Sequence, residues 1–493
     1  MSRANTHNNT LASWLHVRGD GSQRVLRELH LDSRQVGPDD VFVALSGAHH
    51  DGRDYAPAAV ARGAAAVLVE TGGLTSELRA LPVPVVEIPD LAQRIALLAA
   101  DFYRLDETRV AAIGVTGTNG KTTVSCLLAQ MLTALGARCA LVGTLGWGFD
   151  GALQDTGMTT PDAVSMARII RVLDAQGASN VAIEVSSHAL TQGRTAGVSF
   201  AAAVFTNLSQ DHLDYHGDMA AYGAAKRHLF LVRDGLAVLN IDDAFGRQLF
   251  ADRDIAEPKL SYSLHDAQAD VHCEAIDYGV SGSRAVIVTP WGKDTIHCPL
   301  PGDFNLLNML ACITLLGGWG YGLDELLPVL ASAHGAAGRM EVVRNSGTMV
   351  IVDYAHTPDA LDKVLRSLRR HAAGQLRVVV GCGGNRDRGK RPLMGLAATE
   401  LADAAIFTSD NPRDEQPEAI LADMLQGLSP EARARVVVEV DRGRAIRRAL
   451  EQADDGDVVV IAGKGHEDYQ DIRGQRLPFS DRANVLDYYA EVG

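Results

Sequence analysis

The sequence predicts an α/β protein of three domains: a small N-terminal α/β domain, a central P-loop ATPase domain with a parallel sheet, and a C-terminal doubly wound, Rossmann-like domain. A chain of 493 residues is too long for one core, because domains usually hold roughly 100 to 200 residues. Continuous apolar runs alternate with helical stretches, as in parallel sheets buried on both faces. We expect the domains to span residues 1–107, 108–337 and 338–493.

Short apolar runs bounded by polar or glycine residues mark the strands in chain order. Between residues 259 and 301 the pattern changes to apolar–polar alternation, which indicates antiparallel strands. Helices are expected between the runs, for example at 305–316, 359–370 and 444–453. The predicted strands are 41–45, 65–69 and 83–88, then 110–115, 181–185, 201–206 and 236–240, and finally 349–352, 376–380, 404–408, 436–440 and 458–462.

Composition narrows the functional class. A net charge of −15 disfavours an extended nucleic-acid surface, because neutralising phosphates requires clustered Lys and Arg. No apolar run reaches the roughly 18 residues that span a bilayer, and the N-terminus lacks the apolar core of a signal peptide. We therefore expect a cytoplasmic protein that neither enters a membrane nor binds nucleic acid.

A glycine-rich segment follows the predicted strand 110–115 and precedes a helix. Its glycines let backbone N–H groups approach phosphate oxygens, Lys121 can reach the terminal phosphates, and the Thr122 hydroxyl can bind Mg²⁺. A chance turn before a structural helix is the alternative, and Gly114 lies one residue before the usual glycine position. The predicted ATP-binding residues of this loop are Thr116, Gly117, Thr118, Asn119, Gly120, Lys121 and Thr122.

Acidic and imidazole groups follow the neighbouring predicted strands. Glu184 and His212 could hold Mg²⁺ beside a triphosphate, although Mg²⁺ prefers oxygen ligands. The alternatives are a structural carboxylate network for Glu184 and a surface or packing role for His212. From its surroundings alone, Lys226 is interpreted as a solvated helix lysine.

The C-terminal part carries polar loops directly after four predicted strands. The loops span residues 353–358, 385–391, 410–413 and 463–467. Ligands of doubly wound sheets collect at the carboxyl ends of the strands. Arginines in these loops could bind a carboxylate through two N–H groups, and Glu467 could pair with a cation. This polarity suits a zwitterionic substrate.

In combination these segments resemble the Mur ligase family, whose members build the peptide stem of bacterial cell-wall precursors by ATP-dependent amide formation. The resemblance covers nearly the whole chain and, within the family, favours the members that add meso-diaminopimelate, because Asp410 to Arg413 resembles their signature. Arg413 and Arg386 could hold the distal carboxylate that lysine lacks. The segments that carry it are 117–123, 184–188, 207–214, Lys226, 302–308, 338–341 and 353–358.

The resemblance implies roles for individual residues. Lys121, Lys226 and His212 would be catalytic, and Lys226 would be carbamylated by CO2, which makes it an oxygen ligand. Thr122, Glu184, His212 and carbamylated Lys226 would bind Mg²⁺, and Asn305, Arg339 and Asp353 would complete the ATP site. The UDP-linked substrate would contact Leu31, Ser33, Ala48, His49, His50, Thr159, Thr160, Ser186, Gln192 and Arg194. Diaminopimelate would contact Arg386, Asp410, Asn411, Pro412, Arg413, Gly463 and Glu467.

The implied substrates are ATP, a UDP-N-acetylmuramoyl-dipeptide and meso-diaminopimelate, and we expect a monomer in the bacterial cytoplasm. No residue identifies itself as the base for the incoming amine, for which His356 is only a candidate. A lysine-adding Mur ligase and a folylpolyglutamate synthetase-like ligase are the close alternatives. A P-loop switch that hydrolyses nucleotide and a diaminopimelate-binding module with vestigial nucleotide affinity are the distant ones.

Overall fold

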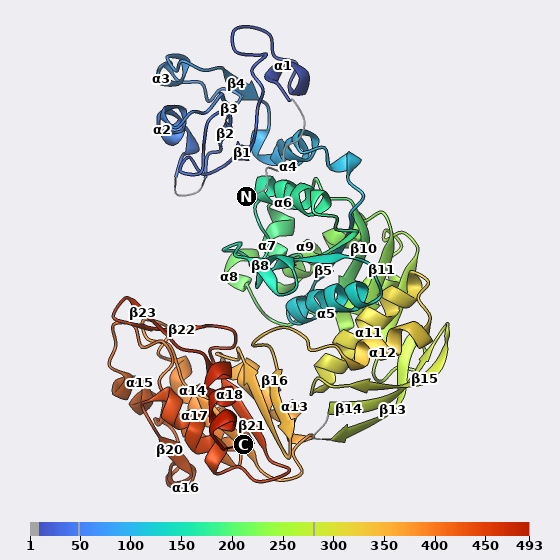
Figure 1. The fold of residues 1–493 in the computed structure, drawn as a ribbon, viewed down its shortest axis with the longest axis vertical. Coiled ribbons are helices and arrows are strands. Elements are labelled where there is room, and N and C mark those ends of the chain that lie inside the picture. Colours follow the sequence, from blue (N-terminus) through green and yellow to red (C-terminus); the bar gives the residue numbers. More distant parts are fainter. Residues whose placement is uncertain (1–8, 48–49, 280–281, 493) are drawn as a thin grey trace. The chain divides into compact units, whose positions relative to one another are not determined.

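The computed structural model describes residues 9–47, 50–279 and 282–492 (Figure 1). By its internal contacts the chain divides into two compact units, residues 1–260 and 261–493. We describe each unit by itself. No helix in the described part of the chain is both long and apolar enough to cross a membrane.

The first unit begins with a four-stranded sheet in the order β1-β2-β3-β4, and all its neighbouring strands are parallel. Alternate residues of these strands face opposite ways, so Phe42 and Val67 pack with α2 and α3 while Val43 and Leu68 pack with α4. The elements are α1 (Leu11–Trp14), β1 (Leu29–His30), β2 (Val41–Ala44), η1 (Gly52–Tyr55), α2 (Ala56–Ala61), β3 (Ala66–Glu70), α3 (Ser76–Arg79), β4 (Val85–Ile88), α4 (Leu91–Phe102) and η2 (Leu105–Glu107).

The larger sheet of the first unit has the strand order β8-β7-β6-β9-β5-β10-β11. Neighbouring strands are parallel along the stretch β6-β9-β5-β10-β11. Strands β7 and β8 add an antiparallel edge beside β6. Helix α5 contacts β5, β6 and β9. The elements are β5 (Ala111–Thr116), α5 (Lys121–Ala134), β6 (Cys139–Gly143), β7 (Gly146–Phe149), β8 (Ala152–Gln154), α6 (Ala163–Ala175), β9 (Asn180–Glu184), α7 (Ser187–Thr191), β10 (Phe200–Phe205), α8 (Leu213–His216), α9 (Met219–Leu231), β11 (Leu236–Asn240) and α10 (Ala244–Ala251).

Strand β12 (Lys259–Ser263) runs across the division between the units. The second unit continues with an antiparallel meander of β13, β14 and β15, as the alternating pattern predicts. Strand β12, however, pairs with β13 in parallel, so the prediction of antiparallel strands is wrong for this pair. Alternation of apolar and polar residues indicates that one face of a strand is exposed, but it does not fix the direction of the strand. The elements that follow are β13 (Val271–Gly279), β14 (Gly282–Thr289), β15 (Gly292–Cys298), α11 (Asp303–Gly318) and α12 (Leu323–Ala331).

The C-terminal sheet has the strand order β16-β17-β21-β18-β19-β20, with only β16 antiparallel to its neighbour. Helices cover both faces, since Val458 and Val460 of β21 pack with α13 and α14 whereas Val459 and Ile461 pack with α17 (Figure 1). This confirms the doubly wound prediction. The elements are β16 (Glu341–Ser346), β17 (Thr348–Asp353), α13 (Pro358–Arg369), β18 (Leu376–Val380), α14 (Lys390–Leu401), β19 (Ala404–Phe407), α15 (Pro417–Met424), α16 (Pro430–Ala434), β20 (Val436–Val438), α17 (Arg442–Glu451), β21 (Val458–Ala462), β22 (Tyr469–Ile472), β23 (Gln475–Pro478) and α18 (Asp481–Val492).

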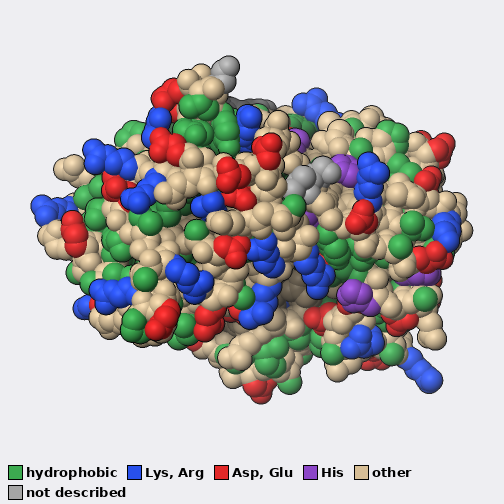
Figure 2. Space-filling model, turned by 90° about the horizontal axis from the view of Figure 1, so that it is seen from below, with side chains coloured by type: hydrophobic (Ala, Val, Ile, Leu, Met, Phe, Trp, Pro, Cys, Tyr) green, Lys and Arg blue, Asp and Glu red, His purple; other side chains and the backbone are tan. Residues whose placement is uncertain are grey.

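The protein surface mixes charges of both signs. On the face that Figure 2 shows, lysine and arginine side chains are interspersed with acidic and apolar ones. All six cysteines are buried free thiols.

Candidate functional site

A glycine-rich loop joins β5 to α5 in the first unit. Thr116 ends the strand and donates its hydroxyl to the Val185 carbonyl at 2.8 Å. Gly117 has a φ of 147° and Gly120 a φ of 87°, conformations that L side chains rarely adopt. A Cβ atom at Gly117 would lie 1.9 Å from the Thr206 hydroxyl oxygen. The loop therefore requires glycine, and it presents the N-terminus of α5, where an anion is favoured.

Two side chains, those of Lys121 and Asn207, hold the loop. Lys121 Nζ donates to the carbonyls of Gly117 and Thr118 at 2.9 and 3.0 Å. The Asn119 N–H donates to Asn207 Oδ1 at 3.0 Å. The Lys121 ammonium thus lies directly over the turn of this loop.

Gly114 belongs to the strand and not to the loop. A Cβ atom at this position would lie 3.0 Å from the Phe200 ring and 3.1 Å from Leu229. Close packing of β5 against these two side chains accounts for a glycine at this position. The unusual glycine spacing therefore reflects the sheet, while the phosphate loop itself begins at Gly117.

The Glu184 carboxylate lies at the end of β9, beside the start of α5. It is fully buried, and it accepts hydrogen bonds from the Thr122 hydroxyl at 2.9 Å and the Thr144 N–H at 2.8 Å. A Cβ atom on Gly143 would lie 2.1 Å from Glu184 Oε1, so glycine makes room for the carboxylate. Burial raises the pKa of Glu184, and the nearby Lys121 ammonium partly offsets that rise.

Lys226 lies on α9 and is buried, with 1% of its surface exposed. Its Nζ donates to the Gly117 carbonyl at 2.8 Å and lies 4.4 Å from the centre of the Tyr222 ring. The Tyr222 hydroxyl lies 3.2 Å from Thr118 Oγ1. Burial lowers the pKa of Lys226 to about 6, and Lys121 adds to the lowering. The interpretation from sequence surroundings alone, a solvated helix lysine, is wrong, because α9 turns this position toward the phosphate loop.

His212 precedes α8 with a φ of 52°, and its side chain is 47% exposed. Its Nε2 lies 3.3 Å from Asp211 Oδ2, and its ring packs edge-on against His188 at 4.8 Å between centres. Within residues 9–47, 50–279 and 282–492, no three His, Cys, Asp or Glu side chains are grouped to hold a metal. The structure brings Thr122 and Glu184 into contact, whereas His212 contacts Asp211 and His188.

The oxygen donors fit a hard cation. A threonine hydroxyl and a carboxylate are ligands that Mg²⁺ accepts, and a cation beside Glu184 would offset the cost of burying its charge. The amine of Lys226 would present a nitrogen atom, whereas Mg²⁺ is bound by oxygen ligands. Lys226 could therefore join Thr122 and Glu184 as a ligand only in its carbamate form. Thr122 and Glu184 could therefore hold Mg²⁺, with Lys226 as a conditional ligand.

Most residues predicted for the peptide end of the substrate lie together at the same edge of the sheet. The predicted set is Thr159, Thr160, Ser186, Gln192 and Arg194. The Thr160 hydroxyl lies 3.2 Å from Ser186 Oγ, and the Thr159 hydroxyl lies 3.1 Å from that of Thr144. Arg194 donates to Gln192 Oε1 at 2.8 Å and to the Thr160 carbonyl at 2.9 Å. These contacts fix Arg194 beside the two threonines.

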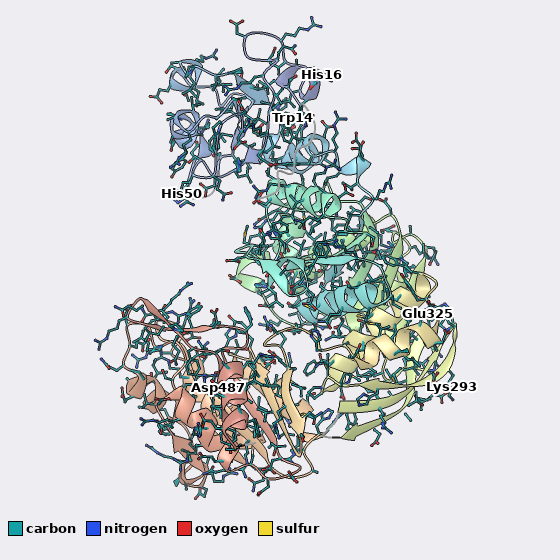
Figure 3. The ribbon with its side chains drawn as sticks, viewed as in Figure 1. Trp14, His16, His50, Lys293, Glu325 and Asp487 are labelled. Carbon is teal, nitrogen blue, oxygen red and sulfur yellow. The ribbon has the colours of Figure 1, made fainter. Side chains whose placement is uncertain are left out.

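The residues predicted for the uridine end are spread over the N-terminal elements. Leu31 lines a cavity of about 230 Å³, whose wall also includes Gln35, Asp162 and Arg168. Ser33 is buried, and His50, labelled in Figure 3, is exposed in the loop after β2. Ala48 and His49 lie outside the described residues.

The remaining predicted nucleotide contacts lie in the second unit. Asn305 is buried and donates to the Pro301 carbonyl at 2.8 Å. The Arg339 guanidinium lies 4.6 Å from the centre of the Tyr354 ring. Asp353 accepts backbone N–H groups, including that of Met340 at 2.8 Å, and burial raises its pKa. The Asp353 carboxylate, at the end of β17, therefore holds the residue that precedes β16.

Loops after β19 and β21 bring Asn411 and Glu467 together. Asn411 Nδ2 donates to Glu467 Oε2 at 2.8 Å, and Lys464 Nζ donates to the same oxygen at 3.1 Å. Gly463 has a φ of 115°, and a Cβ atom there would lie 2.6 Å from Asp410 Oδ2. These predicted amino-acid contacts thus form one polar cluster at the carboxyl ends of the parallel strands, where ligands collect.

The two predicted arginines both lie close to Gly383. A Cβ atom on Gly383 would lie 3.0 Å from Arg413 Nη1 and 3.7 Å from Arg386 Cγ. Arg413 has a φ of 49° and donates to the Gly384 carbonyl at 2.8 Å, and Arg386 is exposed. Pro412 packs its carbonyl against Gly384. Two guanidinium groups near one glycine could bind one carboxylate.

Sequence reasoning missed several residues of these clusters. Tyr222 could have been found, since it precedes Lys226 by four residues on a helix. Lys464 lies between two glycines of a predicted strand-end loop, which is also a readable signal. Thr144 and Arg168 gave no such signal, because no strand was predicted at 139–143 and the cavity wall joins distant segments.

Comparisons with known proteins cover all three parts of the chain. Three family models match: "Mur ligase family, catalytic domain" at residues 26–103, "Mur ligase middle domain" at 115–316, and "Mur ligase, glutamate ligase domain" at 338–465. The chain is 50% identical over 459 residues to the UDP-N-acetylmuramoyl-L-alanyl-D-glutamate–2,6-diaminopimelate ligase of Ectopseudomonas mendocina, covering 93% of both chains. It is 47% identical to the ligase of that name from Alkalilimnicola ehrlichii, covering 98% of both.

Solved structures agree with these matches. A structure of a UDP-N-acetylmuramoyl-L-alanyl-D-glutamate–2,6-diaminopimelate ligase superposes with a TM-score of 0.75 at 38% identity, covering 99% of this chain and 100% of the other. A Mycobacterium tuberculosis folylpolyglutamate synthase has a TM-score of 0.59 at 18% identity, covering 75% and 92%. The second similarity extends to the fold alone.

Proposed function

Because this chain belongs to the Mur ligase family, we infer that it is the ligase that adds meso-2,6-diaminopimelate to UDP-N-acetylmuramoyl-L-alanyl-D-glutamate. The reaction forms an amide at the D-glutamate γ-carboxylate, uses ATP and serves peptidoglycan precursor synthesis. The observation that carries this assignment is the near-50% identity to ligases of that name over 93% of both chains. We propose three domains, residues 1–107, 108–337 and 338–493.

We propose that the γ-carboxylate attacks the ATP γ-phosphate, which gives an acyl phosphate and ADP. The diaminopimelate amine then attacks the acyl carbon and releases phosphate. The Lys121 ammonium over the loop would offset charge on the transferring phosphoryl group, and positioning would supply most of the rate gain. Bound Mg²⁺ would neutralise phosphate charge. Thr122, Glu184, His212 and carbamylated Lys226 are the proposed residues that hold it.

Carbamylation of Lys226 is supported by its surroundings. An unprotonated amine is the form that reacts with CO2, and burial lowers the pKa of Lys226 to about 6. The product is an anion, which would place oxygen ligands next to Gly117 in place of a cation. This exchange also removes the repulsion between Lys226 and Lys121.

We assign substrate selection to two groups of polar residues, one around Arg194 and one around Asn411, Glu467 and Arg413. Arg194, held by Gln192 and Thr160, is proposed to bind the D-glutamyl carboxylate region. Arg413 and Arg386 are proposed to bind the distal carboxylate of diaminopimelate, and Asn411 and Glu467 its amino group. The remaining proposed contacts are Leu31, Ser33, Ala48, His49, His50, Thr159, Thr160 and Ser186 for the UDP-linked substrate, Asp410, Pro412 and Gly463 for diaminopimelate, and Asn305, Arg339 and Asp353 for ATP.

An amino-acid panel tests the function directly. Purified protein, ATP and the UDP-linked dipeptide are mixed with meso-diaminopimelate, lysine, ornithine or glutamate, and phosphate release is measured. We expect release that requires both the dipeptide and diaminopimelate. Preference for lysine would favour the lysine-adding alternative, and release without the dipeptide would favour a nucleotide-hydrolysing switch.

A further inference from the structure

The loop that follows β21 carries a buried lysine. Lys464 has none of its surface exposed, and its Nζ donates to Asn411 Oδ1 at 3.0 Å and to Glu467 Oε2 at 3.1 Å. Its ammonium also lies 5.5 Å from the centre of the Tyr469 ring. Burying an ammonium is costly unless it is paired and hydrogen-bonded, so these acceptors account for its stability there.

The contacts of Lys464 fix the orientation of both acceptors. Asn411 Oδ1 also accepts the Asp471 N–H at 2.9 Å, so the oxygen of this amide faces Lys464 and its nitrogen faces Glu467. The Asn411 nitrogen and the Lys464 ammonium both donate to Oε2 of Glu467. Two donors on one oxygen hold that carboxylate in a single direction.

We propose that Lys464 is a positioning residue that holds Asn411 and Glu467 in the orientation that binds the amino group of the incoming amino acid. The inference rests on the proposed function. In this arrangement Glu467 Oε2 serves the protein and Oε1 serves the substrate ammonium. Lys464 does not touch the substrate and acts through the two side chains that do.

A neighbouring buried cation shows the contrast with a structural role. Arg442 is also buried, but it pairs with Asp481 and donates to the backbone carbonyl of Ala462 at 3.0 Å. Both acceptors of Lys464 named above are instead side-chain atoms of residues assigned to the amino-acid site. Loss of Lys464 is therefore expected to change substrate binding as well as stability.

Lys464→Met tests this role, because methionine keeps most of the volume and removes both hydrogen bonds. We expect the KM for diaminopimelate to rise at least about tenfold, because Asn411 and Glu467 lose a buried charged partner. The KM for ATP should change less than about twofold, because the side-chain partners of Lys464 named above are not among the residues assigned to ATP. The matched control is Arg377→Met, which removes a partly buried ion pair with Asp457 at the opposite edge of the same sheet, where β18 and β21 begin. It should lower thermal stability and leave the KM for diaminopimelate unchanged.

A double-mutant cycle with Glu467→Gln separates positioning from general destabilisation. If Lys464 acts through Glu467, then adding Lys464→Met to Glu467→Gln should raise the KM for diaminopimelate by much less than it does in the wild type. Fully multiplicative effects, or an unchanged KM in the single variant, would overturn the proposal. If Lys464→Met does not fold, Lys464→Arg decides. The larger, planar guanidinium does not fit a site that is closed around an ammonium with none of its surface exposed, so it should displace Asn411 and Glu467, and an unchanged KM would overturn the role.

Assays of the wild-type protein distinguish a failure of this proposal from a failure of the proposed function. Absence of diaminopimelate-dependent phosphate release in the wild type would overturn the function and the role of Lys464 with it. An active wild type with an unaffected Lys464→Met variant would overturn the role of Lys464 alone.

Discussion

Replacing Lys226 by alanine tests the chemistry proposed at the phosphate loop. Burial gives this lysine a pKa of about 6 in place of 10.5. At pH 7 roughly 90% of such amines are unprotonated, compared with about 0.03% at the ordinary pKa, a difference of about three-thousandfold. The fold thus supplies the amine in the form that reacts with CO2.

We expect Lys226→Ala to lower kcat at least about 100-fold, which corresponds to about 2.7 kcal/mol of transition-state stabilisation. The alanine leaves space for a small anion, so millimolar acetate or propionate should restore part of the activity. Phosphate release with the UDP-linked dipeptide and diaminopimelate is the assay. Lys363→Ala, an exposed lysine paired with Asp359 on α13, is the control and should leave activity unchanged.

A spectroscopic readout complements the kinetics. Wild-type protein incubated with ¹³C-bicarbonate above pH 7 should show a carbamate resonance that Lys226→Ala lacks. The signal should fall as the pH drops through about 6, because protonation then removes the reactive amine. A fully active alanine variant, or a wild type without this resonance, would refute carbamylation.

The remaining predictions concern other parts of the site. Arg413→Ala should raise the KM for diaminopimelate about 100-fold and leave the KM for ATP nearly unchanged; equal losses would contradict its assignment to the distal carboxylate. Lys121→Ala should abolish acyl-phosphate formation, measured by isotope exchange between ATP and ADP, and undiminished exchange would exclude its phosphate role. Gly117→Ala should weaken ATP binding, because the new Cβ would meet Thr206 Oγ1 at 1.9 Å at a φ of 147°. Gly136→Ala is its control, since φ is 89° but no heavy atom lies within 4 Å; similar ATP affinities would be contrary to expectation.

Residues within one short segment could be assigned from the sequence. The phosphate loop from Gly117 to Thr122 lies between a strand and a helix, as predicted, because its glycine spacing and flanking apolar run are local properties. The polar loops after β17, β18, β19 and β21 were also found, since buried parallel strands are continuous apolar runs. The direction of a strand depends on its partner in the sheet and not on its own sequence. In the segment 259–301, β12 therefore pairs in parallel with β13, against expectation.

The fold class, the glycine-rich loop and the strand-end loops that carry the polar residues follow from local patterns in the sequence. The surroundings of each charged group follow from how the folded chain packs. That packing buries Lys226 beside Gly117, places Thr144 on Glu184, and holds Asn411 and Glu467 with Lys464. The physical reason is that burial and hydrogen-bond partners depend on segments far apart in the chain, whereas periodicity and turn chemistry depend on neighbours.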